Sequence, residues 1–404
     1  MRVYKHLSQL VTLESAVKKD GRHLVASDLS VIEDGAIVFD EKIIHWVGKT
    51  SELPLEFKTL SSLDLSGHVL LPEIIDSHTH AVFGGDRALE YAERLNGTSY
   101  EEIAKRGGGI LFTMNETHKL NPNELFELAK CRLEKIFNYG VGTVEVKSGY
   151  GLSYAKEKEL SEVIFRLKNH FSPRYQIFNT YLAAHDIPKD FPDSKTYLAD
   201  VVLPLMKELA DKKIIDAVDI FHEKNYFTTD DVKKLFSKAK ELNLACKIHA
   251  DELNTNGGAE LACEFKALSA DHLLKISQEG ISQLAKSSTV ATLLPGTALF
   301  LGKPLAPARA MLDAGVKVAL ASDYNPGSCH VDNLILIASM SAANLKMNQA
   351  EIWAALTLNA SAALGLKNQG VLATGFKSRF SLFKAPTLSH ISYHWGTNLA
   401  VNLP

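Results

Sequence analysis

Between residues 70 and 366, apolar runs of about five to eight residues alternate with stretches of helical periodicity. Such alternation is typical of parallel strands joined by crossover helices. Four helices are expected at 122–139, 154–169, 229–243 and 277–286. Eight strands are expected at 69–80, 142–148, 176–185, 217–223, 245–252, 267–273, 289–294 and 316–323. Eight parallel strands in about 300 residues predict an α/β fold of the (β/α)8 TIM-like barrel type.

The two ends of the chain have a different pattern of short alternating strands. Before the barrel we expect strands at 29–32, 35–39 and 42–48, separated by turns at 33–35 and 40–41. After it, apolar runs at 370–372, 380–383 and 391–395 have the same character. We therefore predict that residues 1–69 and 367–404 together build a small composite β-sandwich domain, with the barrel of residues 70–366 inserted between them.

A doubly wound sheet is the alternative arrangement of alternating strands and helices. It would place a glycine-rich phosphate loop after its first strand, and no G-x-G-x-x-G motif follows that strand here. The three consecutive glycines at 107–109 are not followed by Lys-Ser or Lys-Thr, as a phosphate loop would require. A barrel is therefore favoured, with a flexible loop at 107–109 over its pocket.

Composition narrows the possible partners. The chain has 404 residues, 46% of them apolar and 23% charged, with a formal net charge of -3. This balance gives no reason to expect nucleic acid or an anionic membrane as a partner. The four cysteines have no C-x-x-C spacing, and no apolar run approaches the length of a membrane span. We expect a cytoplasmic protein without disulfides that acts on a small molecule, and any acidic substrate must be held by local arginines.

Polar residues at the predicted strand ends are candidates for a metal site. His78 and His80 are one residue apart near the end of the first strand, so both side chains project to the same side. A bare histidine pair also fits two polar residues at a strand end. However, later strands end in His249, His272 and Asp323, and the carboxyl ends of barrel strands meet at one rim. Imidazoles with a carboxylate suit zinc, iron or another divalent first-row metal.

A metal ion at this rim would lower the pKa of a bound water and polarise a substrate carbonyl. Glu252 lies three residues beyond His249, where it can meet the substrate or the water. Its alternative role is to cap the following loop.

Six motifs in order along the chain resemble those of the imidazolonepropionases, a family within the amidohydrolase superfamily of metal-dependent hydrolases. The motifs lie at 78–87, 107–110, 145–152, 249–262, 269–273 and 321–328. The sequence departs from the family pattern at Glu73, where glycine is usual after Pro72, and at Ser77, where proline is common. Ser328 stands where threonine is common and keeps the hydroxyl, whereas Glu73 and Ser77 lie in supporting backbone.

The resemblance implies hydrolysis of a carbon–nitrogen bond in a cyclic amide: 4-imidazolone-5-propanoate is opened to N-formimidoyl-L-glutamate in histidine degradation. It assigns one zinc or iron ion per chain to His78, His80, His249 and Asp323. Proton transfer falls to His272, Glu252 and Asp323, in an order that the resemblance leaves open. Arg87 would bind the substrate carboxylate, and a homodimer is expected. The other residues implied to line the substrate pocket are Tyr150, His185, Glu252, Asn325, Gly327 and Ser328.

Three other functions share part of this pattern. A two-metal cyclic amidase would need a bridging lysine at the end of the fourth strand, which instead ends in His222-Glu223 with Lys224 one step beyond. An aminohydrolase acting on a nucleobase shares the ligand set, but Arg87 suits an anionic substrate better. A non-catalytic scaffold would be expected to lack at least one ligand, and all are present. Lys147, on the second strand, is interpreted as an ion-pairing residue.

Overall fold

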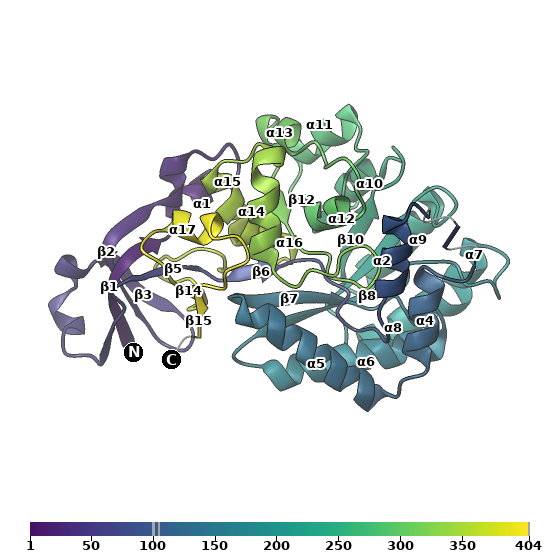
Figure 1. Ribbon diagram of the computed structural model, residues 1–404, viewed down its shortest axis with the longest axis horizontal. Helices are drawn as coiled ribbons and strands as arrows, with labels where there is room; N and C mark the ends of the chain where they lie inside the picture. Colours follow the sequence, from purple (N-terminus) through teal and green to yellow (C-terminus); the bar gives the residue numbers. More distant parts are fainter. Residues whose placement is uncertain (99–101, 104–105, 403–404) are drawn as a thin grey trace.

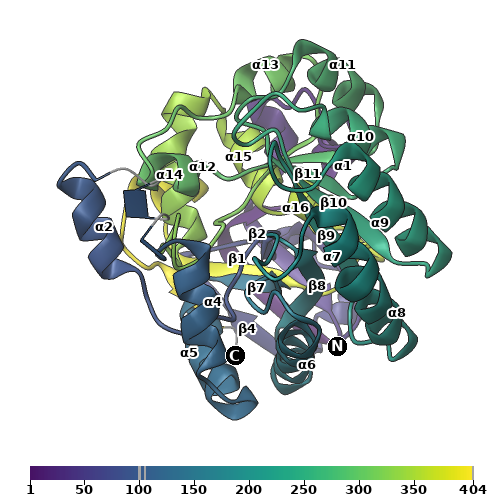
Figure 2. The same cartoon turned by 90° about the vertical axis from the view of Figure 1, so that its right-hand side faces the viewer.

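The barrel is the larger part of the computed structural model, which describes residues 1–98, 102–103 and 106–402 (Figure 1). Its eight strands are parallel and lie side by side in chain order, with helices around the outside (Figure 2). This confirms the predicted (β/α)8 barrel. The strands are β6 (Ile74–Asp76), β7 (Val141–Lys147), β8 (Gln176–Ala184), β9 (Ala217–His222), β10 (Ala245–Ala250), β11 (Ser269–His272), β12 (Val290–Leu293) and β13 (Val318–Leu320).

The barrel closes just beyond its first and last strands. Within the described residues no ladder joins β6 to β13. Instead, a parallel bridge pairs Thr79 with Tyr324. The backbone N–H of Asp323 donates to the carbonyl of His78 (3.0 Å), and that of His80 donates to the carbonyl of Tyr324 (2.9 Å). The segments that close the barrel therefore carry three of the four candidate metal ligands, His78, His80 and Asp323.

The helices around the barrel begin where the sequence supplies capping residues. Asn121 and Glu124 form a reciprocal capping box at the start of α5, and Thr228 and Asp231 form one at α9. The helices from the first half of the chain are α1 (Glu14–Lys18), α2 (Ala88–Leu95), α4 (Ile110–His118), α5 (Pro122–Asn138), α6 (Tyr154–Phe171), α7 (Ser194–Tyr197) and α8 (Leu203–Asp211). Those from the second half are α9 (Thr229–Glu241), α10 (Gly258–Glu264), α11 (Gln278–Lys286), α12 (Pro295–Phe300), α13 (Ala308–Asp313), α14 (Leu334–Leu345), α15 (Gln349–Leu356), α16 (Leu358–Ala363) and α17 (Leu388–Tyr393).

A second sheet of seven strands takes its members from both ends of the chain, as predicted (Figure 1). The rings of Tyr4, Phe39 and Phe380 meet edge to face in its core, so β1, β2 and β14 are joined by aromatic contacts. All seven strands belong to one hydrogen-bonded sheet. They are β1 (Arg2–Val11), β2 (Val31–Phe39), β3 (Ile44–Lys49), β4 (Ser62–Asp64), β5 (His68–Pro72), β14 (Phe380–Lys384) and β15 (Ala400–Val401). The predicted domain boundaries at 69/70 and 366/367 stay predictions.

The expected first barrel strand at 69–80 is wrong in its extent. Residues 68–72 form β5, which belongs to the second sheet and pairs with β14, and only Ile74–Asp76 form the barrel strand β6. One apolar run thus serves two sheets. His78 and His80 follow the strand instead of ending it. Their shared direction is fixed by the closing hydrogen bonds to the segment after β13.

Several expectations for the small domain also differ from the structure. The turn expected at 33–35 lies inside the continuous strand β2, where Asp34 has a φ of 48° and the register with β1 shifts between Gly35 and Ile37. The run at 370–372 is not a strand. Residues 391–393 of the run expected at 391–395 belong to the helix α17. The apolar residues Leu388 and Ile391 are three positions apart, so a helix buries both on one face. The strand β1 was not expected.

Glu73 sits at the junction of the two sheets, between β5 and β6, and is 4% exposed. Arg379 donates to both of its carboxylate oxygens, through Nε at 2.7 Å and through Nη2. Thr143 on β7 and Gln369 each donate to Oε2 at 2.8 Å. The Glu73 carboxylate therefore ties the C-terminal segment to the barrel.

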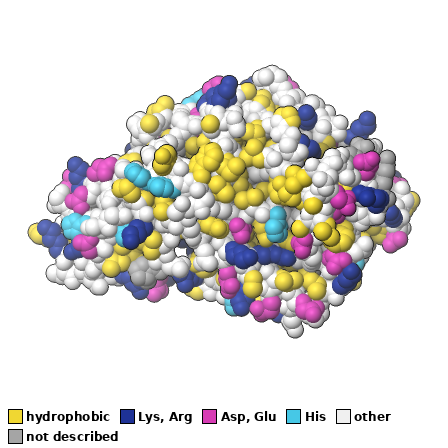
Figure 3. Space-filling model, in the orientation of Figure 1, with side chains coloured by type: hydrophobic (Ala, Val, Ile, Leu, Met, Phe, Trp, Pro, Cys, Tyr) yellow, Lys and Arg dark blue, Asp and Glu magenta, His cyan; other side chains and the backbone are white. Residues whose placement is uncertain are grey.

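The surface in Figure 3 mixes charges of both signs, and hydrophobic side chains gather over α14 near the middle of that face. Most of the α14 sequence is apolar, and one of its apolar side chains, Met340, is 39% exposed. Among the helices described, none is both long and apolar enough to cross a membrane.

Candidate metal centre

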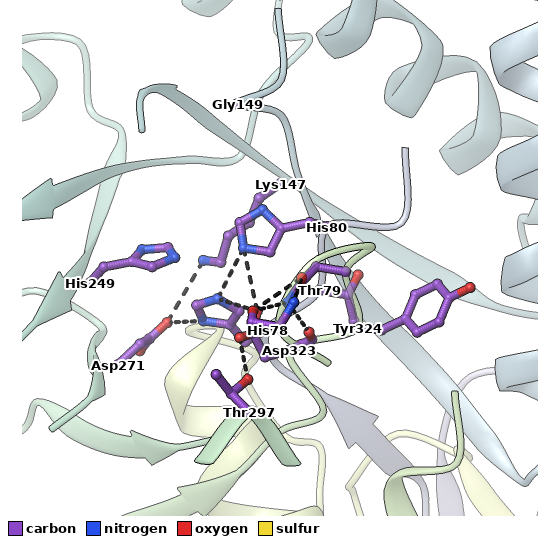
Figure 4. Close-up of polar contacts among 12 residues, drawn as sticks. His78, Thr79, His80, Lys147, Gly149, His249, Asp271, Thr297, Asp323 and Tyr324 are labelled. Carbon is purple, nitrogen blue, oxygen red and sulfur yellow. Dashed lines mark hydrogen bonds and ion pairs between the residues drawn. The ribbon is translucent and has the colours of Figure 1, made fainter. Parts of the chain in front are cut away.

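Three of the four predicted metal ligands converge where the barrel closes (Figure 4). Nε2 of His78 and Nε2 of His80 lie 3.3 Å apart. Oδ1 of Asp323 lies 3.5 Å from the first nitrogen and 3.6 Å from the second. All three residues are 3% exposed or less. The two histidines and the aspartate, from opposite ends of the barrel sequence, therefore present their polar atoms to one point.

His249, at the end of β10, completes the group. One ring nitrogen from each of His78, His80 and His249 can be chosen so that all lie within 4.8 Å of one another. The ring centroids of His249 and His78 are 4.6 Å apart. Because Nδ1 of His249 faces Oδ2 of Asp219 at 3.1 Å, Nε2 is the nitrogen left for a metal.

The donor atoms fit a divalent metal ion. Four ligands at about 2.1 Å from a tetrahedral zinc ion lie about 3.4 Å from one another, close to the separations found among His78, His80 and Asp323. Nδ1 of His78 faces Oδ2 of Asp271 at 2.7 Å, so its Nε2 carries a lone pair. Lone pairs that face one another across a buried point are costly unless a cation lies between them.

Burial sets the charge state of the histidine pair. It is the main cause that holds the pKa of His78 and of His80 well below the usual value, so both rings are neutral and can bind a metal. Burial also lowers the pKa of His249, but the interactions with Asp219 and Asp271 together outweigh it, so that pKa is raised overall. Burial raises the pKa of Asp323 above its usual value. Each ligand thus faces a desolvation cost that a bound cation would offset.

The residues predicted to move protons lie beside the ligand group. His272, at the end of β11, has its ring centroid 5.1 Å from that of His249 and 5.6 Å from that of His78. Its Nε2 lies 3.6 Å from Oε2 of Glu252. The hydroxyl of Thr297 donates to Oδ2 of Asp323 at 2.5 Å, which leaves Oδ1 directed at the histidine pair.

Tyr150 and His185 line one side of the centre. The His185 ring stacks on His80 with centroids 5.1 Å apart, and Tyr150 lies 5.6 Å from His185. Nδ1 of His185 lies 3.2 Å from the carbonyl of Gly149. Burial, followed by repulsion from His249, lowers the pKa of His185 to about 3, so its ring is neutral near pH 7.

The loop that carries Tyr150 is held from within by Glu157. This buried carboxylate accepts the backbone N–H groups of Gly149 (3.2 Å), Gly151 (2.6 Å) and Leu152 (3.0 Å). Three donors converging on one side chain fix the position of the loop. Tyr150 therefore faces the centre from a rigid support.

The guanidinium of Arg87 lies against Gly327, a residue of the predicted substrate pocket. A Cβ atom at position 327 would lie only 1.9 Å from Nη1 of Arg87, so the guanidinium packs directly on the glycine. Glu90 accepts from Nε of Arg87 at 2.8 Å and lies 2.7 Å from Nη2. Asn325 shapes the same loop: Nδ2 donates to the carbonyl of Asp323 (2.6 Å), and Oδ1 accepts from the backbone of Ser328 (2.7 Å).

Sequence reasoning assigned no role to several residues that support the ligands. Asp219 and Asp271 face the Nδ1 atoms of two candidate ligand histidines, and Thr297 donates a hydrogen bond to the candidate ligand Asp323. An acidic residue inside a fully buried strand was the available signal, since Asp219 and Asp271 interrupt the apolar runs of β9 and β11. Lys147 forms ion pairs, as interpreted, at 2.9 Å from Glu145 and 2.7 Å from Asp219.

Comparison with known proteins places this arrangement in a family. The model of the amidohydrolase family matches residues 69–398. The chain is 40% identical to the imidazolonepropionase of Bacillus mycoides (strain KBAB4) over 397 residues, covering 97% of this chain and 92% of that protein. It is also 40% identical to the imidazolonepropionase of Bdellovibrio bacteriovorus over 378 residues, covering 92% of this chain and 88% of that protein.

Solved structures share the fold at low sequence identity. Atrazine chlorohydrolase from Arthrobacter aurescens, complexed with zinc, superposes with a TM-score of 0.65 at 17% identity, covering 95% of this chain and 87% of that chain. Guanine deaminase from C. acetobutylicum gives a TM-score of 0.66 at 17% identity, covering 95% and 90%. The family match and the full-length relatives show that the chain belongs to the amidohydrolase family and, within it, to the imidazolonepropionases.

Proposed function

We propose that the protein hydrolyses the ring of 4-imidazolone-5-propanoate to N-formimidoyl-L-glutamate. The observation that carries this proposal is the loop at 323–328. At one end it supplies Asp323 to the ligand group, and at the other Gly327 lies against the guanidinium of Arg87. The five residues from Asp323 to Gly327 thus join the proposed metal centre to a cation for a carboxylate, which suits a substrate with a reactive ring and a short acidic side chain.

We propose one zinc or iron ion per chain, held by His78, His80, His249 and Asp323. When bound, the ion supplies Lewis-acid activation of water and of the ring carbonyl. Lys224, next to the end of the fourth barrel strand, is exposed, so its side chain is not in place to bridge a second ion. This favours one metal over the two of a cyclic amidase.

The protein groups around the centre divide the proton work. In the overall step, water forms a bond to the ring carbonyl carbon, the bond from that carbon to nitrogen breaks, and the nitrogen takes up a proton. Asp323 accepts the proton from water and passes it to the departing nitrogen. His272 polarises the ring carbonyl. Glu252, whose Oε2 lies 3.6 Å from Nε2 of His272, orients the substrate and the water.

Substrate recognition falls to the side chains around the Arg87 loop. Arg87 binds the propanoate group, because a guanidinium fork matches a carboxylate. Its Nε and Nη2 atoms face Glu90, and Nη1 lies at Gly327 on the side of the loop. The other groups that we propose for the substrate are those of Tyr150, His185, Glu252, Asn325, Gly327 and Ser328.

The test is turnover of imidazolonepropanoate, followed by the decay of its ultraviolet absorbance. We expect decay with formation of formimidoylglutamate, and slower turnover of the analogue in which the propanoate is an uncharged amide. Arg87→Ala should raise KM for the acid and remove this preference for the charged substrate. Turnover of a hydantoin or of guanine, with no decay of imidazolonepropanoate, would overturn the proposal.

The cytoplasmic location and the homodimer expected from the sequence stay proposals. Light scattering of the purified protein tests the second, with an expected mass about twice the 44.4 kDa of one chain. A mass equal to that of one chain would contradict it.

A further inference from the structure

Five charged side chains lie buried inside the barrel, next to the candidate metal ligands. They are each 1% exposed or less, and they come from the barrel strands β7, β9, β10 and β11. We call them the buried ion network. Its members are Glu145, Lys147, Asp219, Lys247 and Asp271.

Lys147 connects the two aspartates of the network. Its Nζ lies 2.7 Å from Oδ2 of Asp219 and 3.7 Å from Oδ2 of Asp271. The same oxygen of Asp219 is 3.1 Å from Nδ1 of His249, and the same oxygen of Asp271 is 2.7 Å from Nδ1 of His78. One ammonium group therefore sits behind two of the proposed metal ligands (Figure 4).

Lys247 supports the first ligand segment. Its Nζ donates to the backbone carbonyl of Ser77 at 2.8 Å, directly before His78. It also lies 3.0 Å from Oε2 of Glu145 and 3.7 Å from Oδ2 of Asp271. Glu145 faces both lysines, since the same oxygen is 2.9 Å from Nζ of Lys147.

The network is expensive to bury and therefore requires an explanation. A buried ion pair is weak grounds for stability, because desolvation can exceed the attraction between the charges. Removing one partner, by contrast, leaves an uncompensated charge in the interior. Two lysines face three carboxylates, so one negative charge is in surplus. Two of the three carboxylates, those of Asp219 and Asp271, face proposed ligand histidines.

We propose that Lys147 and Lys247 are positioning residues of the metal centre. They hold the carboxylates of Asp271 and Asp219 against Nδ1 of His78 and His249, so that both rings present Nε2 before any metal binds. A carboxylate that accepts from Nδ1–H fixes the tautomer and the orientation of a ligand histidine. The inference rests on the proposed metal centre and not on the identity of the substrate.

The test compares zinc affinities of purified proteins by competition with a chromophoric chelator. Lys147→Met removes the charge at similar length, and we expect zinc to bind about 10 to 100 times more weakly. Lys317→Met is the matched control, because Lys317 is also largely buried and pairs with Asp20 at 2.7 Å, but outside the network. The control should lose some thermal stability and keep its zinc affinity.

A second variant and a second readout decide the case if Lys147→Met does not fold. Glu145→Gln keeps the shape of the side chain that faces both lysines, and it should also weaken zinc binding. In NMR spectra of the metal-free wild type, the Nδ1–H protons of His78 and His249 should be protected from exchange. Both resonances should be lost in Glu145→Gln. Zinc affinity within twofold of wild type in a folded variant overturns the proposal, as does a wild-type protein that binds no zinc. Wild-type protein that binds zinc but leaves imidazolonepropanoate intact would overturn only the proposed substrate.

Discussion

Nε2 of His78 lies 3.5 Å from Oδ1 of Asp323, although the two residues follow the first and last strands of the barrel. The backbone N–H of Asp323 donates to the carbonyl of the same histidine at 3.0 Å. The same segments therefore close the barrel and bring two of the proposed metal ligands together. A substitution that separates the segments after β6 and β13 should therefore also disturb the proposed metal site.

Asp323→Asn should bind metal more weakly and lose activity by roughly a thousandfold, since metal activation is worth several kcal/mol. The amide cannot supply the anionic ligand or accept the proton from water. Metal content by elemental analysis and kcat on imidazolonepropanoate are the measurements. Thr297→Val, which removes only the hydroxyl that holds Oδ2 of Asp323, should have a smaller effect in the same direction. Full activity in Asp323→Asn would contradict the ligand assignment.

Gly327→Ala should impair substrate binding and spare the metal. The added Cβ would lie 1.9 Å from Nη1 of Arg87, so the guanidinium must move. A displaced charge-assisted contact costs about 1.5–3 kcal/mol, which predicts KM higher by at least about tenfold. Steady-state kinetics and metal analysis on the same preparation test this. An unchanged KM would show that Arg87 does not bind the substrate from its present position.

Glu73→Met should lower the free energy of unfolding by about 3 kcal/mol, because it leaves Arg379 without its buried partner. The double variant Glu73→Met/Arg379→Met should recover most of that loss, since a buried pair can often be replaced by apolar side chains at little cost. Urea unfolding of wild type, both single variants and the double variant gives the coupling. Additive losses would mean that the two side chains act independently.

His185 should make stability depend on pH. Burial lowers its pKa in the folded state to about 3, whereas the unfolded value is near 6.5. Between these values the unfolded chain binds a proton that the folded protein does not, so folded stability falls as the pH drops through this window. The destabilisation caused by His185→Gln should therefore be smaller at about pH 4.5 than at pH 7. Urea unfolding at the two pH values measures it, and equal destabilisation at both would contradict the neutral buried ring.

Much of the barrel could be predicted because each strand after the first is a separate apolar run with a helix behind it. The run at 69–80 misled because two strands of different sheets follow one another there, separated only by Glu73. Apolar content alone cannot show that the chain changes sheets. Likewise the helix at 388–393 looks like a strand until the burial of Leu388 and Ile391 on one face is known.

Part of the candidate site could be predicted from the sequence and part could not. Histidines at strand ends carry their own signal, so His78, His80 and His249 could be proposed from the sequence. Supporting residues such as Asp219 and Lys247 act through partners on other strands. The contact between Asp219 and His249 depends on the register between β9 and β10, where His249 lies opposite Phe221. Sequence spacing within one strand does not contain that information.

The most direct test of the account is to titrate metal-free protein with zinc while following hydrolysis of imidazolonepropanoate. The four proposed ligands, His78, His80, His249 and Asp323, predict that activity rises linearly and stops rising at one equivalent of zinc per chain. Hydrolysis at full rate without metal, or a break at two equivalents, would contradict a single buried centre.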